Sequence, residues 1–226
     1  MNVLIIGGSS DIGINLGKYL SSLGYNVVNT YNNHRIDNMI KCDVTNEANI
    51  EDTIKTVINK FGNIDILINM SATYNDNNFL NKTKDEFMKV LEVNLVGTFL
   101  CNKIYSKYID NGMIINIGST DGIDTYNEYN IDYAASKAGV INISKSISKC
   151  TNNKILCVCP NWIDSDSTRS MDKDFLNKEL SRIGQNRLIT IDEFCNSIYE
   201  IINDKYESGS IIRMDIRNDK LWIGKV

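Results

Sequence analysis

Histidine and proline are almost absent from this sequence, in which His34 is the only histidine and Pro160 the only proline. A metal site built on several histidines is therefore excluded. A Ser-His-Asp hydrolase would depend on this single histidine, which disfavours that mechanism as well. We expect neither a metal centre nor the usual hydrolase machinery.

The sequence also lacks an excess of basic residues and any long apolar run. It has 24 Lys and Arg against 28 Asp and Glu, a formal net charge of −4, so nucleic acid and anionic membranes are not expected partners. No run approaches the roughly 20 apolar residues of a membrane helix. The segment from Met1 to Ile6 lacks the regions of a secretory signal. We therefore expect a cytoplasmic protein that acts on a small molecule.

The six cysteines lack the spacing of a metal site or a disulfide framework. Only Cys157 and Cys159 lie close together, in the apolar run Ile155–Cys159. Side chains alternate along a strand, so both thiols are expected on one face of it. We predict buried, reduced thiols rather than a metal or redox site.

Apolar β-branched runs alternate with stretches of helical length along the chain. Seven runs are expected to be strands: Val3–Ile6, Val27–Thr30, Ile40–Cys42, Ile64–Ile68, Met113–Ile117, Ile155–Cys159 and Ile211–Met214. The alternation predicts one doubly wound, Rossmann-type α/β domain over residues 1–226, with a parallel sheet of about seven strands between two layers of helices. Only nine residues separate Thr30 from Ile40, so this crossover should be shortened and lack a full helix.

A glycine-rich turn follows the first predicted strand. The segment from Gly7 to Gly13 reads Gly-Gly-Ser-Ser-Asp-Ile-Gly and leads into a helical pattern through Leu16 and Leu20. Backbone amides at such a turn, aligned with the helix dipole, bind a pyrophosphate. A glycine cluster alone is equally typical of an ordinary tight turn. Its position after the first strand favours a dinucleotide site.

A second pattern, Tyr-x-x-x-Lys, places Tyr133 and Lys137 fourteen and eighteen residues after Ser119, which follows the fifth predicted strand. Positions i and i+4 share a helix face, so both side chains can point into one cleft. A nearby ammonium favours a phenolate, and Lys137 is therefore expected to lower the pKa of Tyr133 from its usual value near 10. Tyr133 would then exchange a proton with a substrate oxygen that Ser119 hydrogen-bonds. Alone, the pattern is more typical of an ordinary surface helix.

In this order, the two patterns resemble the short-chain dehydrogenase/reductase family. The family's turn reads T-G-x-x-x-G-I-G and matches at Gly7, Ile12 and Gly13, whereas Ile6 and Asp11 depart from it. Asp11 replaces the middle glycine and brings a carboxylate close to the expected phosphates. Its side chain must turn away, or cofactor affinity must suffer.

Four further segments carry the resemblance down the chain. They are Asp43-Val44, similar to the family's adenine-contacting pair; Asn69-Met70-Ser71-Ala72, in the place of N-N-A-G; Val93-Asn94-Leu95, similar to the element with the active-site asparagine; and Pro160–Ser165, similar to P-G-x-I-x-T with Asn161 in place of glycine. By resemblance, Asn94 would hold a water that relays protons from Lys137. The alternative is a core asparagine that distorts a helix.

The resemblance implies a catalytic group and a cofactor group. The catalytic residues would be Asn94, Ser119, Tyr133 and Lys137. The cofactor-binding residues would be Gly7, Ser9, Ser10, Asp11, Ile12, Gly13, Tyr31, Asn32, Asn33, Arg35, Asp43, Val44, Asn69, Met70, Ser71, Tyr133, Lys137, Pro160, Trp162 and Ile163.

The end of the second strand bears on the choice of cofactor. NAD sites usually place an acidic side chain there to hold the ribose hydroxyls. The segment from Thr30 to Arg35 has no acid, so NADP is favoured, with Arg35 near the 2′-phosphate. NAD remains an alternative because Asp37 can still reach the ribose, and Arg35 can be a solvated loop charge.

The family resemblance implies an NADP-preferring oxidoreductase that moves a hydride between the cofactor and a carbonyl or alcohol, with Tyr133 as general acid and base. The pattern is closest to 3-oxoacyl-carrier-protein reductases and generic carbonyl reductases. An acidic carrier protein needs a basic docking face. A solvated acidic face is expected instead, formed by Asp110, Asp121, Asp124, Glu128 and Asp132. Lys103 and Lys107 are the nearest basic candidates.

Two other functional classes stay open. A non-catalytic regulator would sense a dinucleotide without turnover, and an interaction protein would bind none. The polar, lid-like stretch Trp162–Gln185 has no anchor that identifies a substrate. The resemblance also implies a homodimer or homotetramer built through the helices that contain Asn94 and Tyr133.

Overall fold

The computed structural model describes residues 1–33, 35–125 and 128–226, so His34 lies outside the described residues. Within these ranges the chain forms an eight-stranded sheet in the order β3-β2-β1-β4-β5-β6-β7-β8. The strands are β1 Asn2–Ile6, β2 Asn26–Tyr31, β3 Ile40–Lys41, β4 Ile66–Asn69, β5 Met113–Ile117, β6 Lys154–Pro160, β7 Ser210–Arg217 and β8 Lys220–Lys225. All neighbours in this order from β3 through β2 and β1 to β7 pair in parallel, and β8 pairs antiparallel with β7. The order reverses between β1 and β4, where such sheets bind ligands at their carboxyl edge.

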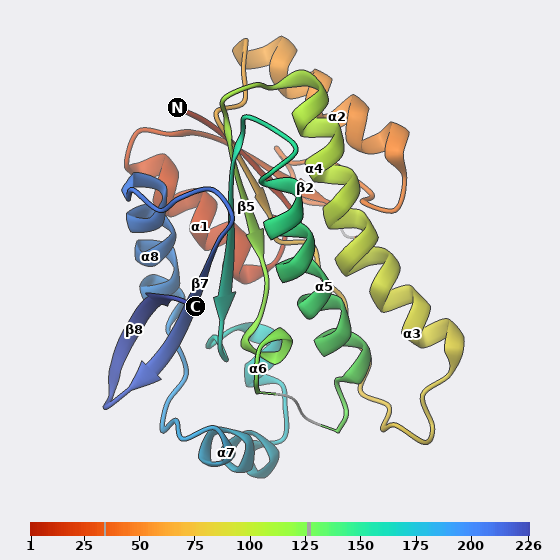
Figure 1. Ribbon diagram of the computed structural model, residues 1–226, viewed down its shortest axis with the longest axis vertical. Helices are drawn as coiled ribbons and strands as arrows, with labels where there is room; N and C mark the ends of the chain where they lie inside the picture. The colour runs from red at the N-terminus through yellow and green to blue at the C-terminus, as the bar shows by residue number, and fades with distance from the viewer. Residues whose placement is uncertain (34, 126–127) are drawn as a thin grey trace.

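Helices cover both faces of this sheet (Figure 1). They are α1 Asp11–Ser22, α2 Glu47–Phe61, α3 Lys84–Leu91, the π-helix Glu92–Val96, α4 Gly97–Tyr108, the 3₁₀-helix Thr120–Gly122, α5 Ile131–Ile147, α6 Asp166–Arg169, α7 Lys173–Arg182 and α8 Ile191–Asn203. One face carries α1 and α8, and the other carries α2, α4 and α5. The predicted doubly wound α/β fold is confirmed.

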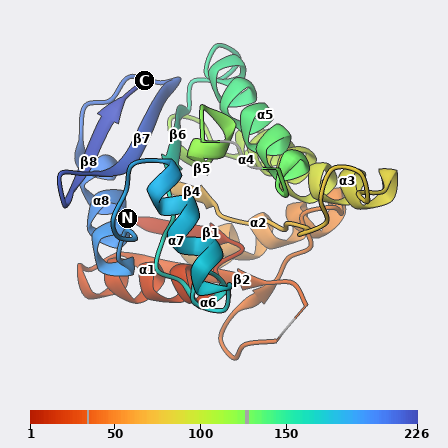
Figure 2. The same cartoon turned by 90° about the horizontal axis from the view of Figure 1, so that it is seen from below.

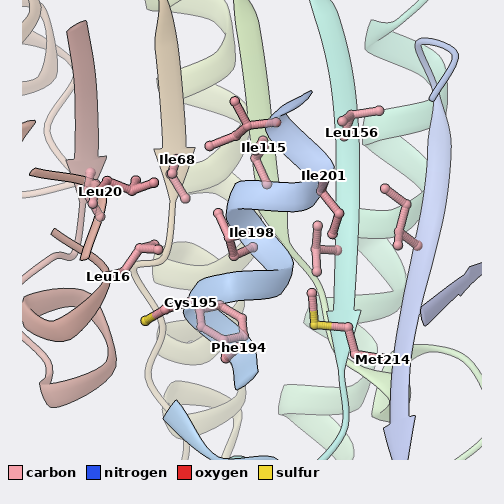
Figure 3. Packing of buried hydrophobic residues seen from close by; sticks show 14 of the residues in the cluster. Leu16, Leu20, Ile68, Ile115, Leu156, Phe194, Cys195, Ile198, Ile201 and Met214 are labelled. Carbon is pink, nitrogen blue, oxygen red and sulfur yellow. The ribbon is translucent and has the colours of Figure 1, made fainter. Parts of the chain in front are cut away.

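The core between the sheet and the layer of α1 and α8 is built from side chains that the helical period places on one face. Phe194, Ile198 and Ile201 of α8 are at most 1% exposed. Figure 3 shows them beside Leu16 and Leu20 of α1 and against side chains from the central strands. This packing fixes α1 at the edge of the site that its first turn helps to form.

Local sequence determines where several helices start. Ser10 caps α1, because its Oγ accepts a hydrogen bond from the Gly13 amide at 3.1 Å. Thr83 and Thr190 each form a capping box with a glutamate three residues later, at α3 and α8. Such caps satisfy amides that the first helical turn leaves without an intrahelical partner.

All seven predicted strands are present, and the shortened crossover is also found. Among the described residues between Thr30 and Ile40 no helix forms, and β3 contains only Ile40 and Lys41. The eighth strand was not predicted. It follows a two-residue turn in which Asn218 and Asp219 have φ values of 50° and 62°, the left-handed geometry typical of tight hairpins.

The cysteines largely follow the prediction. Cys157 and Cys159 are fully buried on one face of β6, with their Sγ atoms 3.8 Å apart. All six cysteines are free, but Cys150 is exposed, so the expectation of burial is wrong for that residue. In the described part of the chain, no helix has the length and apolarity needed to span a bilayer.

Candidate active site

A cavity opens at the carboxyl edge of the sheet. The short helices α6 and α7 lie on the same side of the sheet in Figure 2. Nine of the residues predicted for the site line it: Ser10, Ile12, Met70, Ser119, Tyr133, Lys137, Pro160, Trp162 and Ile163. They come from the glycine-rich turn, the ends of β4, β5 and β6, and helix α5. Segments far apart in the sequence therefore meet around one space.

Tyr133 and Lys137 lie in the first half of α5 and share the helix face that points into this cavity. The Lys137 Nζ atom is 5.4 Å from the centroid of the Tyr133 ring. It donates a hydrogen bond of 2.7 Å to the Ile117 carbonyl at the end of β5. That bond and the 3% exposure of Lys137 fix its positive charge beside the ring.

The expected lowering of the Tyr133 pKa is not found. Burial raises the pKa of Tyr133 well above its ordinary value, the nearby Asp121 carboxylate raises it further, and hydrogen bonding with Ser119 lowers it. Burial also lowers the pKa of Lys137, to about 8. Both shifts have the sign of desolvation, which disfavours the charged form of each group. The shift of the Tyr133 pKa keeps this side chain a phenol at neutral pH, whereas the shift of the Lys137 pKa makes its proton easier to release.

Ser119 stands two residues beyond β5 and is 8% exposed. Its Oγ accepts a hydrogen bond of 3.1 Å from the Asp121 amide and so caps the 3₁₀-helix. This bond holds the hydroxyl at the cavity, in the same lining as Tyr133. The two hydroxyls can therefore reach one substrate oxygen.

Asp121 lines the cavity, although its position in the sequence predicts a solvated surface residue. Its side chain is buried at 8% exposure, and its Oδ1 accepts a hydrogen bond of 2.9 Å from Thr125. Burial raises the pKa of this carboxyl. An acid two residues after Ser119 was the available signal, but charged residues are usually exposed.

Asn94 is fully buried in the π-helix, an element frequent at functional sites. Its Oδ1 accepts from the Thr73 amide at 2.7 Å, and its Nδ2 donates to the Thr73 carbonyl at 2.9 Å and to Ser136 Oγ at 3.0 Å. Asn94 thus joins the loop after β4 to helix α5. The Asn94 side-chain amide is hydrogen-bonded to the loop through Thr73 and to α5 through Ser136. This arrangement holds the loop and the helix in fixed relative positions.

The glycine-rich turn fits the phosphates of a dinucleotide. A Cβ on Gly7, whose φ is +77°, would lie 2.5 Å from the Ser71 backbone nitrogen, and one on Gly13 would lie 2.7 Å from the Gly8 Cα. Only glycine permits this close packing of the turn on the sheet and on α1. The first turn of α1 then faces the cavity through Ser10 and Ile12, an arrangement suited to anions.

Asp11 turns away from this turn and toward α6. Its Oδ2 accepts a hydrogen bond of 2.6 Å from the Asp166 amide and lies 3.5 Å from Arg169 Nη2. The sequence predicts that this side chain either turns away from the phosphates or weakens cofactor binding. In the structure it turns away. The contacts also place α6 beside the start of α1 (Figure 2).

The remaining predicted cofactor residues lie outside the cavity lining. They are Gly7, Ser9, Asp11, Gly13, Tyr31, Asn32, Asn33, Arg35, Asp43, Val44, Asn69 and Ser71. The Asp43 carboxylate accepts from Thr45 in the turn before α2. The Asn69 side chain donates to Asn116 in the core. The Arg35 side chain is highly exposed, and its Nε atom lies 3.9 Å from Asp37 Oδ1.

A buried ion pair lies next to the tyrosine. Lys82 Nζ and Asp132 Oδ2 are 2.9 Å apart, with side chains 2% and 0% exposed. Lys82 also donates to the Asn75 carbonyl at 2.9 Å, and Asp132 Oδ1 accepts from the Tyr133 amide at 2.9 Å. The pair thus ties the loop after β4 to the residue that carries the phenol. Sequence reasoning missed it because fifty residues separate the partners.

The predicted acidic face is confirmed for three of its five residues. Asp110, Asp124 and Glu128 are exposed as expected, and Asp124 accepts two hydrogen bonds of 2.7 Å from Arg213. The prediction is wrong for Asp121 and Asp132, which are buried. These two carboxylates turn inward because each finds a partner there, Thr125 for Asp121 and Lys82 for Asp132, which is the condition for burying a charged group.

Comparisons with known proteins bear on this arrangement. A family model described as enoyl-(acyl carrier protein) reductase matches residues 8–216. Carbonyl reductase family member 4 of Xenopus laevis is 31% identical over 229 residues, which cover 93% of this chain and 94% of that protein. The chain belongs to the short-chain dehydrogenase/reductase family. It is thus a member of an oxidoreductase family, as the motif order predicted.

Other members of the short-chain dehydrogenase/reductase family are similar over nearly the same length. The 3-oxoacyl-[acyl-carrier-protein] reductase of Escherichia coli K12 is 27% identical over 231 residues, 94% of each chain. A short-chain dehydrogenase/reductase structure from Serratia marcescens superposes with a TM-score of 0.85 at 22% identity, covering 95% of this chain and 96% of that one. The aldohexose dehydrogenase of Thermoplasma acidophilum gives a TM-score of 0.82 at 21% identity, covering 94% and 91%. These structures share the fold.

Proposed function

We propose that this protein is an NADP-preferring carbonyl reductase or alcohol dehydrogenase in which Tyr133 is the general acid and base. The observation that carries the proposal is the placement of Ser119, Tyr133 and Lys137 around one cavity that continues to the glycine-rich turn. A nicotinamide cofactor supplies or accepts the hydride when it is bound. A regulator without turnover would have no use for these three side chains together.

In this proposal Tyr133 gives its phenolic proton to the substrate oxygen, and Ser119 donates a hydrogen bond to the same oxygen. Lys137 stabilises the phenolate that forms, because its ammonium is 5.4 Å from the ring centroid and anchored on Ile117. The same groups act in reverse in the oxidative direction. Asn94 holds the loop after β4 against α5 and is proposed to support proton relay from Lys137.

We also propose the remaining parts of the sequence prediction. The cofactor would contact the glycine-rich turn, the segments after β2, β3 and β4, and the Pro160–Ile163 segment. The protein would be cytoplasmic and act as a single catalytic domain. A homodimer or homotetramer through the π-helix that contains Asn94, the adjoining α4 and the helix α5 that contains Tyr133 would cover two exposed apolar side chains, Val96 in the π-helix and Phe99 in α4, which are 44% and 45% exposed.

We expect NADPH to bind more tightly than NADH. Residues 30–35, at the end of β2, include no acid to hold ribose hydroxyls, and the exposed Arg35 can meet a 2′-phosphate once it leaves Asp37. Arg35→Ala should narrow the difference between the two dissociation constants, measured by fluorescence titration. Lys41→Ala, at the exposed end of β3, controls for loss of one charge. Equal affinities in the wild type would contradict the NADP preference and point to Asp37 as a ribose ligand.

A second candidate function, 3-oxoacyl-carrier-protein reductase, is favoured by the names of several relatives. We expect small free or thioester-linked ketones to be reduced at least as readily as carrier-linked ones. Lys103 and Lys107, the basic candidates that the sequence offers for docking, are paired within the protein: their Nζ atoms lie 2.6 and 2.8 Å from Oε1 of Glu47 and Glu51.

The measurement is kcat/KM with NADPH on matched 3-oxoacyl substrates. A much higher value for the carrier-linked form, falling as salt is added, would favour the carrier-protein function over ours, because salt screens attraction between charged partners. Turnover of free ketones at equal or higher efficiency supports the carbonyl reductase proposal.

A further inference from the structure

The Asp11 carboxylate stands in the first turn of α1, where the family pattern has glycine. Its Oδ2 accepts a hydrogen bond from the Asp166 amide and lies near the Arg169 guanidinium. The carboxylate therefore links the glycine-rich turn to α6. A pyrophosphate at the start of α1 would carry about two negative charges into the same region. An uncompensated Asp11 would repel it, by an energy that scales inversely with the separation.

Negative charges outnumber the positive charge around Arg169. Its Nη1 donates to the Asp164 carbonyl and Oδ1 at 2.7 and 3.1 Å, and its Nη2 lies 2.8 Å from Asp166 Oδ1 and 3.5 Å from Asp11 Oδ2. One guanidinium thus serves three carboxylates. Asp164 and Asp166 lie on the α6 side, whereas Asp11 belongs to the turn itself.

Burial separates Asp11 from the other two carboxylates. The Asp11 side chain is 19% exposed, against 42% for Asp164 and 80% for Asp166. Water screens the two outer carboxylates, so their effect on a bound anion is small. Asp11 is the carboxylate whose neutralisation matters for the turn.

We propose that Arg169 is a positioning residue of the cofactor site that acts through Asp11. By neutralising this carboxylate and holding it against α6, Arg169 allows a turn with an acid in place of glycine to accept an anionic dinucleotide. The inference rests on the proposed function, since it takes the turn to bind the cofactor. It adds Arg169 to the residues that the sequence motifs indicate for the site.

The test is a double-mutant cycle on the full-length protein, read out as the dissociation constant for NADPH by calorimetry. Asp11→Asn removes the charge and keeps an acceptor for the Asp166 amide. Arg169→Gln removes the guanidinium charge and keeps a side chain that can hydrogen-bond. Lys173→Gln, at the exposed start of α7, controls for loss of one positive charge from the lid.

We expect Arg169→Gln to weaken NADPH binding on the order of tenfold at low salt. In the Asp11→Asn background the same change should weaken it by no more than about threefold, because the charge to be neutralised is gone. The difference between backgrounds should shrink in about 1 M salt, where the screening length is about 3 Å. Lys173→Gln should leave the dissociation constant nearly unchanged.

Two results would overturn the inference without touching the proposed function. Equal losses from Arg169→Gln in both backgrounds would mean that Arg169 acts on the phosphates or the lid independently of Asp11. No loss in either background would mean that it has no part in cofactor binding. Failure of the wild-type protein to bind NADPH or NADH at all would instead contradict the proposed function itself.

Discussion

Tyr133→Phe should lower kcat by about a hundredfold or more while leaving the dissociation constant for NADPH nearly unchanged. The substitution removes the only atom of the side chain that can give up a proton, and general acid catalysis contributes about 10²–10⁴-fold. The ring keeps its place beside the Lys137 ammonium, whose Nζ lies 5.4 Å from the ring centroid. Steady-state kinetics with a reducible ketone and a parallel cofactor titration separate the two effects.

Tyr129→Phe is the matched control, because Tyr129 is exposed and its ring packs edge-on against Phe175. It should change kcat less than about twofold, as expected for a hydroxyl outside the reaction. If Tyr133→Phe kept more than about a tenth of the wild-type rate, the proton would have to come from another group, and the general-acid role would be wrong.

Lys82→Met should destabilise the fold by about 3–5 kcal/mol, because it leaves Asp132 as a buried carboxylate without its ammonium partner. Methionine fills a similar volume, so little of the loss should come from a cavity. Since Asp132 also accepts the Tyr133 amide, the variant should lose activity under conditions where it is still folded. Urea unfolding followed by circular dichroism gives the stability.

The double variant Lys82→Met/Asp132→Asn tests the cause of that loss. Asparagine keeps an acceptor for the Tyr133 amide without the charge, so the double variant should regain most of the lost stability. Lys103→Met breaks a half-exposed pair with Glu47 and should cost less than about 1 kcal/mol. If Lys82→Met and Lys103→Met lowered the free energy of unfolding equally, burial would not make the Lys82–Asp132 pair more important for stability than the exposed pair.

The central part of the site could be predicted because its signals are local. Tyr133 and Lys137 are four residues apart on one helix, and Ser119 follows a strand that β-branched residues identify. Parallel strands bring their carboxyl ends to one edge, so order along the sequence becomes proximity in space. The fold followed from the same alternation of strand and helix patterns.

The charged part of the site could not be predicted, because a charge in a sequence does not reveal its burial. Lys82 and Asp132 are ordinary surface residues by type, and only the packing of the loop after β4 on α5 encloses them. The same holds for Asp121 and for the contact of Asp11 with Arg169. The partners in the two ion pairs are distant in sequence, and no local period connects them.

The eighth strand is a different case, since its signal was present. Asn218 and Asp219 adopt the left-handed conformation that these residue types tolerate in two-residue hairpins. The run after them, Lys220–Lys225, is short and carries lysine at both ends. Charged ends are typical of an edge strand, and they make such a strand easy to overlook.

Transfer of deuterium from NADPH labelled at the nicotinamide C4 position tests the central claim most directly. With each of the two C4 epimers and a ketone that the enzyme reduces, the account predicts one deuterium on the carbinol carbon of the alcohol from one epimer and none from the other, measured by mass spectrometry. The Tyr133→Phe variant should form this labelled product at least about a hundredfold more slowly. Alcohol product without deuterium from either epimer, or dinucleotide binding with no reduction of any ketone or aldehyde, would contradict the assignment of this chain as a hydride-transferring enzyme.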